Sequence, residues 1–230
     1  MPNPLRSVFL SSLQGIWGLV QKLFADETPH TRPNPNATIW TTRPREARMI
    51  YVMKILIDKY QFPLTGAAGL VGNLYAESAL IPNRIEGSQA ANPMYARDSM
   101  GNFTNFSAEM VMNRVSGQQG PKLAGAGLAQ WTYPPRRKKF FAQPLGANIL
   151  FDMDAQLVFL VDELKTDFVR VYNLLMDADT TVDRACDEVV LKFERPADQS
   201  EAHLQVRRGY AKDAYVYYVK NRDGVIDGKN

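Results

Sequence analysis

Apolar residues recur at intervals of three or four along most of the chain, the spacing that gathers them on one face of an α-helix. The pattern predicts helices over residues 4–24, 42–60, 66–78, 135–141, 154–164, 182–193 and 200–219. Thr42 is the expected cap of the second of these helices, and Thr180 or Thr181 that of the sixth. Because these segments cover most of the chain, the expected fold class is mainly α.

Three glycines, Gly66, Gly69 and Gly72, lie in the helix predicted over residues 66–78. Each weakens an isolated helix by about 1 kcal/mol relative to alanine. Glycine also allows another backbone to approach closely, because it has no Cβ. We therefore predict a central, buried helix that packing stabilises more than intrinsic propensity does.

Two long stretches lack a helical period. Residues 26–42 are rich in Pro, Thr and Asn, a composition typical of a linker. Residues 82–127 are rich in Asn, Gln, Ser, Gly and Met, which favours loops and short strands with one short helix near residues 107–115. So long an irregular stretch in a compact domain is usually functional. We expect a small irregular or β lobe beside the helices, an α+β variation on a mainly α fold.

The linker divides the chain into three predicted parts. Residues 1–44 are an amphipathic helix with a proline-rich linker, which suits docking to a partner. Residues 45–220 are the folded domain, and residues 221–230 are a polar tail. The apolar runs are shorter than the roughly 18 to 20 residues of a membrane span, so we expect no transmembrane segment.

Composition narrows the functions further. The 230 residues include 27 basic and 24 acidic side chains, and a net charge of +3 does not favour nucleic-acid binding. With two histidines and one cysteine, a zinc site would need carboxylates for most of its ligands, so we expect no metal and no cofactor. A nucleophilic pair of Cys186 with a histidine stays open, beside the alternative of an inert core cysteine.

Glu77 is the first candidate for chemistry. It lies near the C-terminal end of a mostly apolar helix, just before the irregular stretch. A carboxyl group there is expected to be half buried, and desolvation favours its protonated form. A general acid for glycoside cleavage must hold a proton in this way. Taken alone, Glu77 also fits a solvated glutamate at a helix end.

Residues 125–133 are the second candidate and read Gly-Ala-Gly-Leu-Ala-Gln-Trp-Thr-Tyr. Gln130 can both donate and accept hydrogen bonds, as a sugar hydroxyl or acetamido group requires. Trp131 and Tyr133 offer flat faces for stacking on pyranose rings. The alternative for both rings is a place in the core beside a turn.

Four segments, in this order, resemble blocks of the phage tail lysozyme family, which is related to goose-type lysozymes and lytic transglycosylases. They are Gly72–Ser78, Gly127–Thr132, Gln156–Leu164 and Phe193–Asp198. The first ends in Glu77-Ser78, and the second contains Gly-Leu-Ala-Gln. The resemblance covers about residues 45 to 218.

This resemblance implies a lysozyme-like fold and cleavage of the bond between N-acetylmuramic acid and N-acetylglucosamine in peptidoglycan. It implies that Glu77 is the catalytic acid and that Gln130, Trp131 and Tyr133 bind the glycan strand. It also implies a place on the virion, in the tail or its tip, for local penetration of the host cell wall. Other virion proteins are then the partners expected for residues 1–44.

Three features stay open within this hypothesis. Asp98 and Glu86 are candidates for a second catalytic carboxylate, about 5 to 5.5 Å from Glu77 for a retaining nucleophile or about 6.5 to 9.5 Å for an inverting base. The alternative for either residue is a solvated loop carboxylate. The basic run at residues 136–139 either contacts wall phosphates and peptide carboxylates or is a solvated helical turn. The pair at residues 194–195 is expected to tie down a helix end through an ion pair.

Muramidase activity is the favoured function, and three alternatives stand beside it. A lytic transglycosylase breaks the same bond but leaves an anhydro sugar. A structural tail protein with an inactive lysozyme fold belongs to another functional class. A free lysis enzyme, released at the end of infection, more often carries a separate wall-binding domain.

Overall fold

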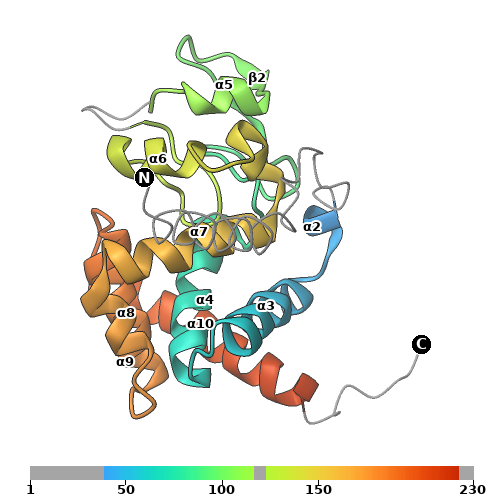
Figure 1. The fold of residues 1–230 in the computed structure, drawn as a ribbon. Coiled ribbons are helices and arrows are strands. Elements are labelled where there is room, and N and C mark those ends of the chain that lie inside the picture. The colour runs from blue at the N-terminus through green and yellow to red at the C-terminus, as the bar shows by residue number, and fades with distance from the viewer. Residues whose placement is uncertain (1–38, 117–122, 223–230) are drawn as a thin grey trace, which may run out of the picture. The chain divides into compact units, whose positions relative to one another are not determined.

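The structure is a computed structural model that describes residues 39–116 and 123–222, and this part of the chain is mainly helical with one small antiparallel sheet. The α-helices are α2 (Ile39–Thr42), α3 (Arg45–Lys54), α4 (Leu64–Ser78), α5 (Ala108–Met112), α6 (Pro134–Phe141), α7 (Met153–Thr166), α8 (Val169–Leu175), α9 (Val182–Glu188) and α10 (Glu201–Arg222). The strands are β1 (Tyr95–Arg97) and β2 (Phe103–Asn105). The predicted fold class, mainly α with a small β lobe, is confirmed (Figure 1).

Most of the predicted helices are present with small shifts at their ends. The helix predicted over 42–60 is α3, extended by a π-helical turn over Ile55–Lys59, and the one predicted over 182–193 is α9, extended by a π-helical turn over Val189–Glu194. Thr181 caps α9 as predicted, because its hydroxyl accepts a hydrogen bond from the backbone of Arg184. The structure adds α8 and a 3-10 helix over Gly146–Phe151, which the periodicity did not predict. The helix predicted over 4–24 lies outside the described residues.

The start of α3 differs from the prediction. Pro44, not Thr42, occupies its N-cap position. A proline disfavours helical backbone in the residue before it, so a helix begun at Thr42 cannot continue through Arg43. Thr42 instead ends the short helix α2. Trp40 of α2 is buried, with its ring 4.7 Å from that of Tyr51, so the folded unit includes part of the predicted linker.

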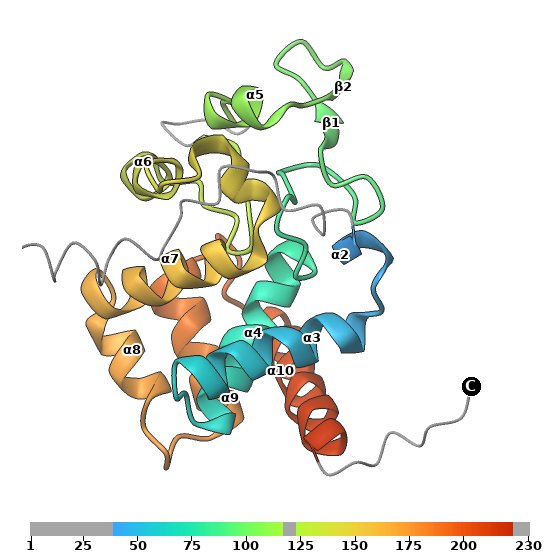
Figure 2. The same ribbon diagram turned by 45° about the vertical axis from the view of Figure 1, so that its right-hand side comes forward.

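Helix α4 lies at the centre of the larger group of helices and contacts α3, α8, α9 and α10 (Figures 1 and 2). Its three glycines face three different neighbours. A Cβ added at Gly66 would lie 1.9 Å from the carbonyl oxygen of Leu175, one at Gly69 would lie 2.7 Å from the backbone nitrogen of Cys186, and one at Gly72 would lie 2.5 Å from that of Ala211. The prediction of a buried central helix with close backbone contacts is therefore confirmed.

We expect Gly72→Ala to lower the free energy of unfolding by about 1 to 3 kcal/mol, because the new methyl group must push α10 away from α4. Gly209→Ala is the matched control, since its Cβ would meet nothing within 4 Å. Gly209 lies inside α10, so alanine there should stabilise the protein by about 0.5 to 1 kcal/mol. Chemical denaturation of both variants measures the difference, and equal effects would contradict the packing argument.

The small lobe contains β1, β2, α5 and α6, and α7 runs between this lobe and α8 (Figures 1 and 2). The strands pair antiparallel, with Tyr95 opposite Asn105 and Arg97 opposite Phe103. Ser107 caps α5 by accepting a hydrogen bond from the backbone of Met110, near the position predicted for a short helix. In the part of the chain that the structure describes, no helix is long and apolar enough to cross a membrane.

Candidate functional site

Glu77 lies in the last turn of α4, where the helix enters the small lobe. Ala79 ends the helix in a left-handed conformation with φ of 55°, and the Ser78 hydroxyl donates to the carbonyl of Leu74. The side chain of Glu77 is 19% exposed, so the predicted partial burial is found. Its Oε1 accepts a hydrogen bond, whereas its Oε2 has no partner among the described residues.

Arg207 of α10 holds Glu77 in place. Its Nη2 donates to Glu77 Oε1 at 2.6 Å, its Nη1 to Asn73 Oδ1 at 3.2 Å, and its Nε to His203 Nε2 at 2.8 Å. Arg207 is buried, so these charge-assisted bonds form with little competition from water. Three fixed acceptors orient the guanidinium, which in turn restricts the Glu77 carboxylate.

Asn73 lies one helical turn before Glu77 and joins α4 to α9. Its Nδ2 donates to the carbonyls of Gly69 at 2.9 Å and Cys186 at 3.0 Å. Cys186 is fully buried, and burial raises the pKa of its thiol to about 12. A protonated, inaccessible thiol does not support the nucleophilic cysteine considered above. Its place in the core fits the alternative of an inert cysteine.

Glu194 ends the π-helical turn that follows α9. Burial raises the pKa of Glu194 well above its usual range, and the negative charge of Glu77 raises it further. Its Oε1 is a buried atom without a hydrogen-bond partner among the described residues. The prediction of an ion pair at this helix end is wrong for the described residues: Arg195 has a left-handed backbone conformation with φ of 51°, and its Nε donates to the carbonyl of Lys192.

Trp131 packs in the core. It is 1% exposed, and its ring stacks on Phe140 with centroids 4.4 Å apart. Its Nε1 donates to Glu163 Oε2 at 3.0 Å. Arg136 also binds Glu163, through Nε at 2.7 Å and Nη2 at 2.8 Å. The structure therefore favours the core alternative for Trp131 over stacking on a sugar ring.

Gln130 lies in a turn that is fastened to the segment after α4. Its Nε2 donates to the carbonyls of Arg84 at 3.0 Å and Gly127 at 2.9 Å. Gln156 of α7 supports the same turn, since its Oε1 accepts from the backbone of Leu128 at 2.8 Å. Gly127 has a φ of 81°, and a Cβ there would lie 2.8 Å from both Gln156 and Trp131. The segment that follows α4 therefore begins beside Glu77 and is hydrogen-bonded to Gln130 at Arg84.

Tyr133 differs from its neighbour Trp131 in exposure. It is 58% exposed and directly precedes α6, whose N-cap position it occupies. Its ring is therefore accessible for contact with a ligand, as the stacking hypothesis requires.

Glu86 and Asp98 both make hydrogen bonds that stabilise the small lobe. Glu86 accepts from the Ser116 hydroxyl at 2.8 Å and from the Gly125 backbone at 2.9 Å. Asp98 Oδ1 accepts from the backbones of Met100 and Asn102, both at 2.9 Å, in the turn between β1 and β2. These hydrogen bonds give both carboxylates a structural role in the small lobe, so neither requires a catalytic one.

The basic run over residues 136–139 does not form a continuous charged surface. Arg137 is buried, and its guanidinium donates to backbone carbonyls of the small lobe, those of Val111, Ala124 and Trp131. Burial lowers the pKa of Arg137 to about 10. Arg136 binds Glu163, which leaves the two lysines as the exposed part of the run.

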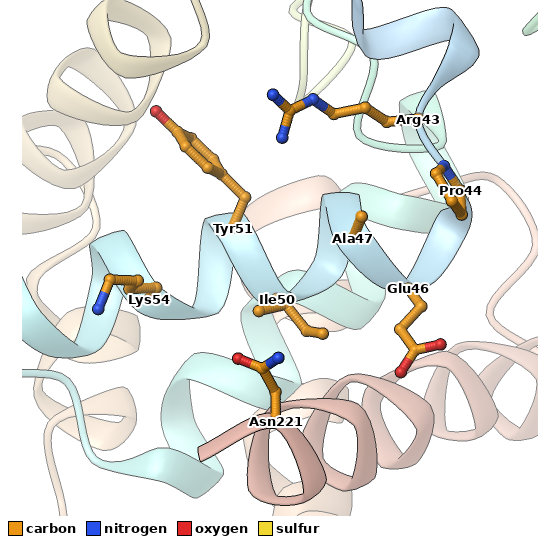
Figure 3. A pocket seen from close by; sticks show the side chains of 8 residues that line it. All are labelled: Arg43, Pro44, Glu46, Ala47, Ile50, Tyr51, Lys54 and Asn221. Carbon is orange, nitrogen blue, oxygen red and sulfur yellow. The ribbon is translucent and has the colours of Figure 1, made fainter. Parts of the chain in front are cut away.

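A pocket of about 370 Å³ lies beside α3 (Figure 3). Its lining residues are Arg43, Pro44, Glu46, Ala47, Ile50, Tyr51, Lys54 and Asn221. It contains no candidate site residue, so we do not place the active site there. Within residues 39–116 and 123–222, no group of three or more His, Cys, Asp and Glu side chains is arranged to hold a metal ion.

The comparison with protein families matches the model of the phage tail lysozyme family over residues 47–218. Neither the curated proteins nor the solved structures give a match. The matched range contains Glu77, Asn73, Glu194 and Arg207, and it excludes the N-terminal segment. Because the match covers most of the 230 residues, the chain belongs to the phage tail lysozyme family, whose members are peptidoglycan-degrading lysozymes of bacteriophage tails.

Proposed function

We propose that this protein is a muramidase that hydrolyses the bond between N-acetylmuramic acid and N-acetylglucosamine, with Glu77 as general acid. The observation that carries the proposal is the state of the Glu77 carboxyl at the end of the buried helix α4. One oxygen is held by Arg207, and the other has no partner among the described residues. The free oxygen is therefore available to the oxygen of a glycosidic bond.

The reaction needs this acid because an alkoxide leaves poorly at neutral pH. Glu77 donates its proton to the glycosidic oxygen as the bond to the sugar carbon breaks. Since Glu86 and Asp98 are engaged in the lobe, the sugar carbon is attacked by a positioned water or by the substrate's own acetamido group. Gln130 and Tyr133 contribute to binding the glycan strand.

Clearing of purified peptidoglycan, followed by analysis of the released ends, tests this function. A muramidase produces new reducing ends and no anhydro sugar, which mass spectrometry distinguishes by the missing water. Anhydro products would instead assign the lytic transglycosylase reaction to the same Glu77. Absence of both products would favour a structural tail protein with an inactive lysozyme fold.

We further propose that residues 1–44 attach the enzyme to other virion proteins, because the family match begins only at residue 47. A variant that begins at Pro33 keeps Trp40 in the core, where the Trp40 carbonyl accepts a hydrogen bond from Arg48 at 3.1 Å. We expect this variant to melt within a few degrees of the full chain and to clear isolated peptidoglycan equally well. Calorimetry and a clearing assay measure both, and unfolding of the variant would make residues 1–32 part of the core.

A further inference from the structure

Three carboxyl groups and two guanidinium groups interact electrostatically near the C-terminal end of α4. The acids are Glu77 of α4, Glu163 of α7 and Glu194, and the bases are Arg136 of α6 and Arg207 of α10. If every group is ionised, this largely buried cluster carries a net charge of −1. One bound proton makes it neutral, and burial favours the neutral cluster.

The hydrogen bonds distinguish the three acids. Both oxygens of Glu163 accept from Arg136, and Oε2 also accepts from Trp131, which favours a carboxylate. Glu77 Oε1 likewise accepts a charge-assisted bond from Arg207. Glu194 differs, since its buried Oε1 has no donor among the described residues. Glu194 is therefore the acid in this cluster whose surroundings least favour a carboxylate, and burial raises its pKa.

Other charged groups near Glu194 do not change this assignment. Arg136 comes close, because its Nη1 donates at 3.4 Å to the carbonyl of Phe193, but its Nε and Nη2 are bound to Glu163. On its own segment, Lys192 is exposed and Arg195 points back to the Lys192 carbonyl. His203 contacts Arg207 and not Glu194, since its Nε2 accepts the hydrogen bond from Arg207 Nε at 2.8 Å.

We propose that Glu194 is a positioning residue that shares one proton with Glu77 and thereby keeps a protonated Glu77 accessible at neutral pH. The inference rests on the proposed role of Glu77. In the resting form Glu194 holds the proton, and in the reactive form Glu77 holds it while Glu194 is the carboxylate. Both forms contain the same number of protons and the same net charge, so their ratio does not depend on pH.

The proton balance of the reaction is then complete. Glu77 gives the shared proton to the glycosidic oxygen, the bond to the sugar carbon breaks, and both Glu77 and Glu194 are left as carboxylates beside Arg207. One proton from the water that completes hydrolysis restores the pair. Without Glu194 the proton must come from solvent, so the rate of hydrolysis should fall about tenfold for each pH unit along its high-pH limb.

The test is the pH dependence of peptidoglycan hydrolysis by the full chain, its Glu194→Gln variant and the matched control Glu188→Gln. Glu188 lies earlier in the same helical segment and outside the cluster. We expect Glu194→Gln to lose activity at least tenfold at neutral pH and to approach the parent at acidic pH. Its high-pH limb should move to lower pH, whereas Glu188→Gln should follow the parent. An unmoved profile, or an equal loss at every pH, would overturn the proposal.

Stability and spectroscopy give readouts that do not depend on activity. The pKa of Glu194 in the folded protein is raised above the ordinary glutamate pKa of 4.5. Above that pH the unfolded chain loses this proton while the folded protein keeps it, so the contribution of Glu194 to the free energy of unfolding falls as the pH rises. Glu194→Gln should therefore melt at a higher temperature than the parent at neutral pH, and the difference between the two melting temperatures should be smaller at low pH. In the parent, the infrared band of a protonated carboxyl should persist at neutral pH and shift in Glu194→Asp. Absence of that band in the parent would refute the shared proton even if Glu194→Gln fails to fold.

The outcome is distinguishable from a failure of the proposed function. If Glu77→Gln stays active, the role of Glu77 is wrong whatever Glu194 does. If Glu77→Gln is inactive at every pH and the Glu194→Gln profile is unmoved, Glu77 keeps its role and the shared proton is excluded.

Discussion

Glu77→Gln is expected to fold, to bind glycan and to lose peptidoglycan hydrolysis by about 10² to 10⁴-fold, the usual contribution of general acid catalysis. Glutamine keeps the shape of the side chain and an oxygen that can accept the bond from Arg207, but it has no transferable proton. The loss should appear in the rate at saturating substrate rather than in binding, because the proton is transferred only as the bond breaks.

The same variant should be less stable than the parent by about 1 to 2 kcal/mol, because a bond between two charged groups becomes a bond to a neutral amide. Glu194 limits the loss, since it can ionise beside Arg207 once Glu77 is neutral. Circular dichroism and a melting curve establish that the variant is folded before its rate is interpreted. Clearing of the wall near the parental rate would remove Glu77 from the mechanism and direct attention to Glu86 and Asp98.

Trp131→Ala has the largest expected effect on stability, a loss of about 3 to 5 kcal/mol in the free energy of unfolding. The substitution leaves a cavity against Phe140 and against Phe159, whose ring centroid lies 5.3 Å from that of Trp131. It also removes one of the donors that stabilise the buried Glu163 carboxylate. Denaturant titration of the purified variant measures the loss.

Tyr133→Ala is the matched control for Trp131, because it removes an exposed aromatic ring two positions away. We expect it to change stability by less than about 0.5 kcal/mol and to weaken binding of chitin-type oligosaccharides. A Trp131→Ala variant that keeps its melting temperature and loses oligosaccharide binding would show that Trp131 binds the glycan strand.

The helices were largely predictable because most of them present one apolar face to the core. The start of α3 was not, since the restriction that Pro44 places on Arg43 outweighs the capping preference of Thr42. Helix α8 is short, with only Val171 and Leu175 buried, so it contains too little of the 3.6-residue period to be recognised. The burial of Trp131 depends on Phe140 and Phe159, which the local sequence does not identify.

Glu77 is recognisable from its segment, but the groups that surround it come from distant parts of the chain. Arg207 and Glu77 are 130 residues apart, and no local motif joins them. One pattern does mark Arg207. The buried positions of α10 are Leu204, Arg207, Ala211 and Ala214, so a charged residue occupies a place in an apolar stripe. A buried arginine requires a partner, which indicates a carboxylate on a neighbouring helix.

The long separation between Glu77 and Arg207 has a consequence for the order of synthesis. Glu77 is synthesised well before Arg207. The helix that supplies Arg207, α10, is the last one described, and it packs along α4. An incomplete chain therefore contains the acid without the group that orients it, and Gly72 faces no backbone of α10. We expect a nascent or C-terminally clipped chain to leave peptidoglycan intact, so that degradation begins only with molecules whose translation is finished.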